Sequence, residues 1–149
     1  MLLMELSLHI ILQSPPPGVH FGLQKGSGSK YETVQTQQSD SGDLHFDLTV
    51  TIRGDRAKDQ SPRFGGPFAQ GSYPDNFIYI DIGTYAGKDD IWSRRLKIPL
   101  SGISWDIIDQ AAANPELVLE AHVPGTAKDG SPTCATVKPF AGWKVKSAV

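Results

Sequence analysis

Residues 43–53 read DLHFDLTVTIR, and the strict alternation in this segment decides the fold class. Successive side chains of an extended chain point to opposite faces, so every second residue from Leu44 to Ile52 lies on one apolar face. The intervening side chains, among them His45 and Asp47, are polar. A strand with one wet face is typical of an antiparallel sheet rather than of a parallel sheet covered on both sides.

The same period of two recurs along most of the chain. Together with strand-like composition in residues 31–37, which are polar on both faces, it predicts further strands over residues 4–12, 19–24, 31–37, 77–82, 92–100, 117–123, 133–138 and 143–146. Many short strands separated by turn residues predict a mainly-β fold, either a two-layer antiparallel β-sandwich or a flattened barrel, with one short helix. We expect residues 1–149 to form a single β-rich domain, and the pattern does not choose between sandwich and barrel.

The helix is expected directly after the strand that ends at Leu100. Ser104 is a suitable N-cap, and Trp105, Ile108 and Ala112 would share its apolar face. Asn114-Pro115 would end it, because proline disfavours helical geometry in the preceding residue. Residues 25–29 and 54–67 have the glycine-rich or polar composition of loops.

Composition excludes several functional classes. The chain has 149 residues, 39% of them hydrophobic and 20% charged, which is globular rather than disordered. A net charge of −2 gives no electrostatic reason to expect nucleic acid or an anionic membrane as a partner. The apolar residues 1–12 lack the basic start and the cleavage site of a signal peptide and are too short to span a bilayer, so we expect a strand there.

The single cysteine, Cys134, allows neither an internal disulfide nor a multi-thiolate metal site. This is compatible with a reducing compartment, and we expect a cytoplasmic protein. Cys134 also has no neighbouring histidine in the sequence that would activate it as a nucleophile.

The remaining chemical motifs are incomplete. The glycine-rich residues 22–30 lack the ending of a phosphate-binding loop and precede no helix. His45 and Asp47 could begin a metal site, but such a site needs three or four ligands, and the sequence brings no other histidine to them. We therefore predict no catalytic residue, no metal site and no cofactor.

Two sets of residues are candidates for ligand binding. The first set, on strands that are polar on both faces, is His20, Gln24, Tyr31 and Gln35. A concave ligand-facing surface would explain them, but so would a short edge strand, which tolerates polar residues on both sides, and we favour the edge strand.

The second set combines aromatic and charged residues of two neighbouring strands: Tyr79, Asp81, Tyr85, Trp92 and Arg94. Trp92 and Arg94 belong to the string WSRR at residues 92–95, in which the alternation predicts that Arg95 points outward. Aromatic side chains beside arginines recur at surfaces that bind sugars, carboxylates and peptides. Cross-strand pairs that only stabilise the outer face of a sheet would give the same pattern. Binding by Arg94 together with Tyr79 requires both side chains to lie on one face.

Several longer strings, in this order, resemble an uncharacterised bacterial family, domain of unknown function 5990. The strings are PPPGVHFGLQ at residues 15–24, GPFAQG at 66–71, FIYI at 77–80 and WSRRLKIPL at 92–100, followed by the tryptophan-bearing helix. The resemblance runs from the first strand to Trp143 and implies a free-standing bacterial domain. It carries no activity, cofactor or catalytic residue.

Three functional hypotheses follow. The leading one is a non-catalytic binding domain for a small molecule or a carbohydrate. The second is a protein-interaction or structural module, such as a homodimer formed through an exposed strand. The third is a small hydrolase or isomerase, which would require a histidine and a carboxylate, or Cys134, to converge within hydrogen-bonding distance.

Overall fold

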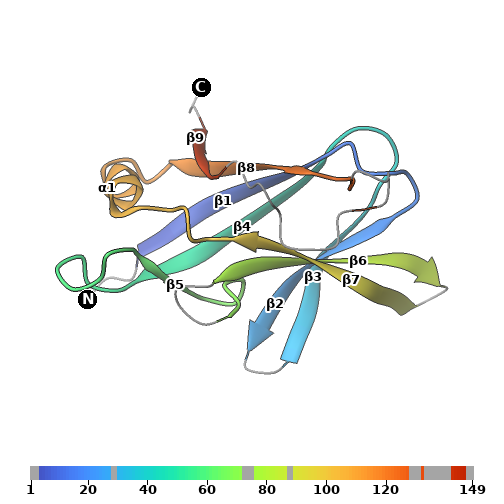
Figure 1. Cartoon of the computed structure of the whole chain (residues 1–149), viewed down its shortest axis with the longest axis horizontal. Helices are drawn as coiled ribbons and strands as arrows, with labels where there is room; N and C mark the ends of the chain where they lie inside the picture. Colours follow the sequence, from blue (N-terminus) through green and yellow to red (C-terminus); the bar gives the residue numbers. More distant parts are fainter. Residues whose placement is uncertain are drawn as a thin grey trace.

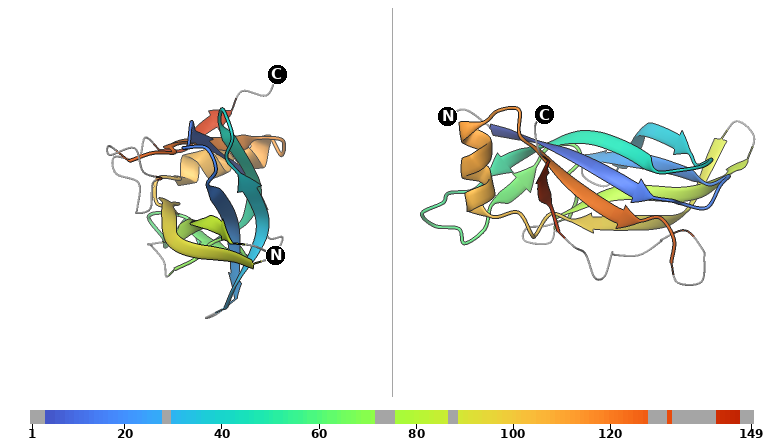
Figure 2. Two further views of the ribbon diagram at one scale, coloured as in Figure 1. Left: turned by 90° about the vertical axis from the view of Figure 1, so that its right-hand side faces the viewer. Right: turned by 90° about the horizontal axis from the view of Figure 1, so that it is seen from above.

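A computed structural model describes residues 4–27, 30–71, 76–86, 89–127, 132 and 142–146. The described strands form two sheets that pack face to face as a sandwich and do not close into a barrel (Figures 1 and 2). This settles the choice that the alternation left open. The predicted strand at 133–138 and Cys134 lie outside the described residues.

The larger sheet has the strand order β5-β4-β1-β8-β9. Its strands are β1 (Met4–Gln13), β4 (Leu44–Arg53), β5 (Arg63–Gly65), β8 (Val118–Pro124) and β9 (Lys144–Lys146). The central strand β1 pairs with β4 in antiparallel register, with Leu8 opposite Leu48. It pairs with β8 in parallel register, with Leu8 beside Leu119. The sheet is therefore mixed, whereas a purely antiparallel fold was expected.

The smaller sheet has the strand order β3-β2-β6-β7. Its strands are β2 (His20–Ser27), β3 (Lys30–Gln38), β6 (Phe77–Ala86) and β7 (Asp89–Pro99), all antiparallel to their neighbours. Strand β3, which is polar on both faces, lies at the edge of this sheet, as the edge-strand explanation requires. In Figure 1 the hairpin of β2 and β3 projects away from the larger sheet.

The core lies between the two sheets and uses the apolar faces that the alternation predicted. Side chains such as Ile10, Phe46 and Leu119 from the larger sheet meet Ile80 and Ile98 from the smaller one, and each of them is fully buried. Full burial of such a side chain contributes about 1.5–3 kcal/mol. This packing fixes which side chains of each strand point outward.

The helix α1 (Trp105–Ala113) lies at one end of the sandwich (Figures 1 and 2). The Ser104 side chain accepts a hydrogen bond from the Ile107 backbone amide, which confirms the predicted N-cap. The helix buries Ile108 and Ala111, whereas Ala112 is exposed. The prediction for Ala112 was therefore wrong by one residue, because Ala111 completes the i, i+3 pair with Ile108.

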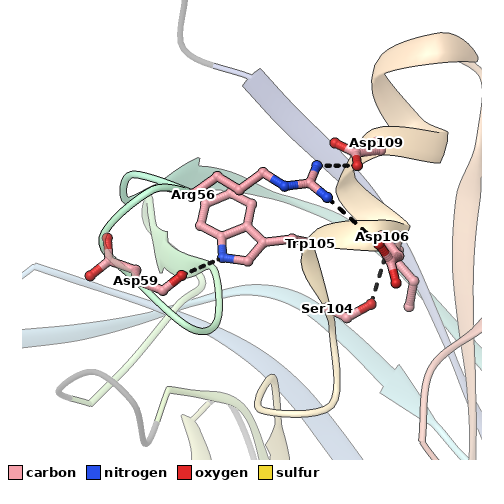
Figure 3. A network of polar contacts seen from close by, with 7 residues as sticks. Arg56, Asp59, Ser104, Trp105, Asp106 and Asp109 are labelled. Carbon is pink, nitrogen blue, oxygen red and sulfur yellow. Dashed lines mark hydrogen bonds and ion pairs between the residues drawn. The ribbon is translucent and has the colours of Figure 1, made fainter.

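Residues 54–62 are attached to this helix by polar contacts (Figure 3). Trp105 Nε1 donates to the Asp59 carbonyl oxygen at 2.8 Å. Arg56 donates a hydrogen bond to Asp109 and lies 3.7 Å from Asp106, and the hydrogen bond to Asp109 is the main cause of the raised pKa of Arg56. These contacts attach residues 54–62, which form a loop as their composition predicted, to α1.

Two predicted loops contain strand. Phe64, within the predicted loop 54–67, is largely buried in the short strand β5, where it pairs with Ile52. The glycine-rich stretch continues β2 as far as Ser27 and resumes with β3 at Lys30. None of the described helices is long and apolar enough to cross a membrane.

Candidate functional site

The outer face of the smaller sheet carries most of the predicted ligand-binding residues. On β2, His20, Gly22 and Gln24 alternate with the buried Phe21 and Leu23, so they point away from the core. On β6, Tyr79 and Asp81 alternate with Ile78, Ile80 and Ile82. On β7, Arg95 and Lys97 are the outward residues, opposite Asp81 and Tyr79.

Asp81 and Arg95 form a bidentate ion pair on this face. Arg95 donates from Nε to Oδ1 at 2.7 Å and from Nη2 to Oδ2 at 3.1 Å. Asp81 is only 6% exposed, although it lies on the outer side of the sheet. The hydrogen bond to Asp81 is the main cause that raises the pKa of Arg95, against an opposing effect of burial. The guanidinium group is therefore a fixed positive charge that covers a buried carboxylate.

The same guanidinium group also contacts two tyrosine rings. Arg95 Cζ is 4.7 Å from the ring centroid of Tyr31 and 4.5 Å from that of Tyr79. The two ring centroids are 5.8 Å apart, with a tilt of 53°. Burial is the main cause that raises the pKa of Tyr79; Tyr31 raises it further, and Arg95 opposes the shift. We call Tyr31, Tyr79, Asp81 and Arg95 the tyrosine–arginine cluster.

Glycine at position 26 makes this cluster possible. Tyr31 is on β3 and Tyr79 on β6, with β2 between them. Gly26 pairs with Tyr31, and a Cβ atom at Gly26 would lie 2.9 Å from Tyr31 Cδ1 and 2.5 Å from Gln70 Oε1. Because Gly26 has no side chain, the ring of Tyr31 can reach across β2. Alternation alone could not have predicted a contact between strands that are not neighbours.

A surface hollow of about 470 Å³ lies beside the cluster. Its lining residues come from the β2–β3 hairpin and the segment before β6: Lys25, Gly26, Lys30, Tyr31, Glu32 and Pro67. Tyr31 is 43% exposed and belongs both to the hollow and to the cluster. Lys25 Nζ lies 3.5 Å from Glu32 Oε2. Among the described lining residues, two lysines and one glutamate give a formal charge of +1.

The other predicted residues of the first set are not among the described residues that line the hollow. Gln24 is 2% exposed and donates to Thr33 Oγ1 at 2.7 Å, and His20 is also buried. Gln35 pairs with the inward-facing Leu23 and therefore lies on the opposite face from Tyr31. Of this set, only Tyr31 is both exposed and beside the hollow.

Arg94 lies on the opposite face of the sheet from Tyr79. It pairs with the buried Ile82, so the condition for binding by Arg94 together with Tyr79 is not met, and Arg95 occupies the expected place instead. The alternation had marked Arg95 as outward without selecting it as a site residue. The side chains of Tyr85 and Trp92 lie outside the described part of the chain.

A second polar cluster lies on the outer face of the larger sheet. Its members are His9 on β1 and His45 and Asp47 on β4, with the Glu120–His122 pair on β8 beside them. No sequence motif joins His9 to His45 and Asp47, because 36 and 38 residues separate them. The strand register brings them together.

The family model of a family of unknown function (DUF5990) matches residues 6–146. The chain belongs to this family. The match confirms the resemblance drawn from the longer strings and covers both sheets and the helix. Neither a curated protein nor a solved structure matches the chain.

Proposed function

We propose that the chain is a non-catalytic binding domain for a small sugar or a carboxylate-bearing sugar, which packs against Tyr31 in the hollow beside the tyrosine–arginine cluster. The observation that carries the proposal is an exposed aromatic ring fixed in place at the wall of a hollow. A volume of about 470 Å³ is within the range of small-molecule sites.

Tyr31 is suited to this role because its ring is already ordered. Arg95 and Tyr79 contact the ring, while 43% of the residue remains accessible. An aromatic side chain presents a large apolar surface next to a polar hydroxyl group, which matches the mixed surface of a sugar ring. A side chain that is ordered before binding loses less conformational entropy when the ligand arrives.

The charges around the hollow favour a ligand that carries a carboxylate. Lys25 and Lys30 line the hollow, and Glu32 neutralises one of these two positive charges by pairing with Lys25. Arg95 is bound to Asp81 and orients Tyr31 rather than offering a free cation. An acidic sugar could place its ring on Tyr31 and its carboxylate near a lysine ammonium group.

The shallow lining predicts weak binding. A monosaccharide of about 12 heavy atoms at about 0.3 kcal/mol per atom gains about 4 kcal/mol, which corresponds to a Kd near 1 mM. Ligand at ten times this Kd adds about 1.4 kcal/mol of stability. For a domain of this size, the Tm should then rise by roughly 3–6 °C.

The test is a thermal-shift screen at about 10 mM of neutral sugars, sugar acids and simple carboxylates. Tyr31→Ala should abolish the shift produced by an active compound. Val34→Ala is the matched control, because Val34 lies on the same strand and is 41% exposed, and this variant should keep the shift. Equal shifts in wild type and Tyr31→Ala would refute the proposal.

The edge position of β3 supports a second candidate, a homodimer formed through this strand. An edge strand has unpaired backbone groups that can pair with another chain. Sedimentation velocity distinguishes the two functions, since a dimer that Val34→Pro disrupts and that no sugar affects would favour the interaction module.

A bacterial, cytoplasmic setting belongs to the same proposal. It is supported by the single cysteine, which allows no internal disulfide, and by the bacterial family that the chain resembles. Fractionation of the native host, followed by detection of the protein, would test it.

A further inference from the structure

The outer face of the larger sheet holds two imidazole rings with nitrogen atoms aimed at each other. His9 Nε2 lies 2.9 Å from His45 Nδ1, and the ring centroids are 5.1 Å apart. The other ring nitrogen of His9, Nδ1, bonds to Asp47 Oδ1. The side chain of His9 is 11% exposed and that of Asp47 is 79% exposed. This cluster is on a different sheet from Tyr31 and is independent of the function proposed above.

The hydrogen bonds determine which nitrogen atoms carry lone pairs. A carboxylate only accepts, so His9 donates its Nδ1–H to Asp47, and neutral His9 presents an unprotonated Nε2. His45 then donates its Nδ1–H to that atom. One hydrogen thus occupies the space between two nitrogens that are both potential metal ligands.

A histidine whose second nitrogen donates to a carboxylate is the usual arrangement of a metal-bound histidine, because the carboxylate fixes the ring and makes its other nitrogen more basic. We propose that this pair is a binding site for one Zn²⁺ ion or a similar transition-metal ion, ligated by His9 Nε2 and His45 Nδ1 and oriented by Asp47. Imidazole nitrogens suit Zn²⁺, Cu²⁺ and Ni²⁺. On binding, the hydrogen of His45 moves through solvent from Nδ1 to Nε2, so the ring stays neutral.

The distance between the two nitrogens is close to what the metal requires. Two nitrogen ligands that each lie about 2.05 Å from a tetrahedral Zn²⁺ are about 3.3 Å apart. His9 Nε2 and His45 Nδ1, which are 2.9 Å apart, must therefore separate by about 0.4 Å. His45 is exposed and can make this movement, whereas His9 is buried and held by Asp47.

Carboxylates flank the pair on both neighbouring strands. Asp47 on β4 and Glu120 on β8 are both register partners of His9 on the central strand β1. Glu120 Oε1 accepts from His122 Nε2 at 2.6 Å, so Glu120 is paired with His122 and is not counted as a ligand of the His9–His45 pair. Within the described ranges, no three or more histidine, cysteine or acidic side chains are arranged to hold a metal ion. The proposed site therefore has two protein ligands, fewer than the three or four of a complete zinc site, so water fills its open positions and binding is weak.

The test titrates Zn²⁺ into the full chain by calorimetry. His45→Ala should weaken binding at least about 10-fold, and Asp47→Asn should weaken it by about 10-fold or more, because removing the carboxylate that orients a ligating histidine has this effect. His122→Ala is the matched control, since His122 is an exposed histidine on the same sheet face and is also paired with a carboxylate. The Zn²⁺ affinity of this variant should stay within about 2-fold of the wild-type value.

A second measurement identifies the ligating atoms. Long-range ¹H–¹⁵N spectra of the histidine rings should show that Zn²⁺ shifts His9 Nε2 and His45 Nδ1, while His9 Nδ1 keeps its proton. The proposal would be overturned if Zn²⁺ did not bind at millimolar concentration. Equal losses of affinity in His45→Ala and His122→Ala would also overturn it, because they would indicate adventitious binding to surface histidines.

Discussion

The ion pair between Arg95 and Asp81 should stabilise the fold more than its place on the outer face of a sheet implies. Asp81 is 6% exposed and receives two hydrogen bonds from Arg95. Arg95→Met keeps a long side chain on β7 but leaves the buried carboxylate without its cation. Removal of one partner from a buried pair costs about 3–5 kcal/mol. Because the Arg95 side chain is 32% exposed, water can reach the carboxylate, and we expect the lower limit, about 3 kcal/mol.

This loss is large enough to measure. About 3 kcal/mol corresponds to a decrease in Tm of roughly 6–12 °C for a domain of this size. Lys97→Met is the matched control, since Lys97 is the next outward residue on β7 and lies 5.8 Å from the ring centroid of Phe77. Loss of such an exposed cation–π contact costs about 0.5–1 kcal/mol. Urea unfolding monitored by tryptophan fluorescence gives both values. Equal destabilisation by the two substitutions would refute the reasoning about Asp81.

Three further substitutions test separate parts of the structure. Tyr79→Phe should reduce the loss of stability at high pH. Because burial raises the pKa of Tyr79 in the folded state, the tyrosine's contribution to stability is complete below its unfolded-state pKa of 10.0 and is lost as the pH rises through its folded-state pKa. Urea unfolding at pH 8 and above pH 10 checks this, and parallel losses in both proteins would contradict it. Gly26→Ala should lower the free energy of unfolding by about 1–3 kcal/mol by crowding Tyr31, and it should weaken any sugar binding. Gly102→Ala is the control: Gly102 has open space around it, so calorimetry and ligand titration should show neither effect. Trp105→Phe removes the hydrogen bond to Asp59, so thermal unfolding should show a loss of about 1 kcal/mol of stability. The same variant should be cleaved faster by protease within residues 54–62, and unchanged cleavage would show that this hydrogen bond does not hold the segment.

The sequence predicted those parts of the fold in which one strand face is buried and the other is wet. The alternation from Leu44 to Ile52 and from Met4 to Leu12 identified β4 and β1 and their inward faces, because that burial is a local property of each strand. The parallel pairing of β1 with β8 could not be predicted, since partner choice depends on contacts between residues about 110 positions apart. Phe64 was missed because a three-residue strand is too short to display a period.

The candidate site was predicted only as a set of outward positions. Tyr31, Tyr79 and Asp81 were selected, but the reach of Tyr31 across Gly26 decides which of them meet. Arg94 was selected where Arg95 makes the contacts, although the alternation of β7 with the inward Leu96 and Ile98 already marked Arg95 as outward. His9 could not be joined to His45 and Asp47, because only the register of β1 and β4 brings these three together.

The proposed function requires that a ligand packs on Tyr31 in the hollow beside the tyrosine–arginine cluster. The most direct test is a ¹H–¹⁵N correlation spectrum recorded during titration with a sugar acid such as glucuronate, up to about ten times the expected millimolar Kd. We predict saturable shifts for the amides of Lys25, Gly26, Tyr31 and Glu32, with His45 and Asp47 on the other sheet unchanged, and we predict no shifts in Tyr31→Ala. Shifts that persist in Tyr31→Ala, or a spectrum that stays unchanged across neutral and acidic sugars, would contradict the account.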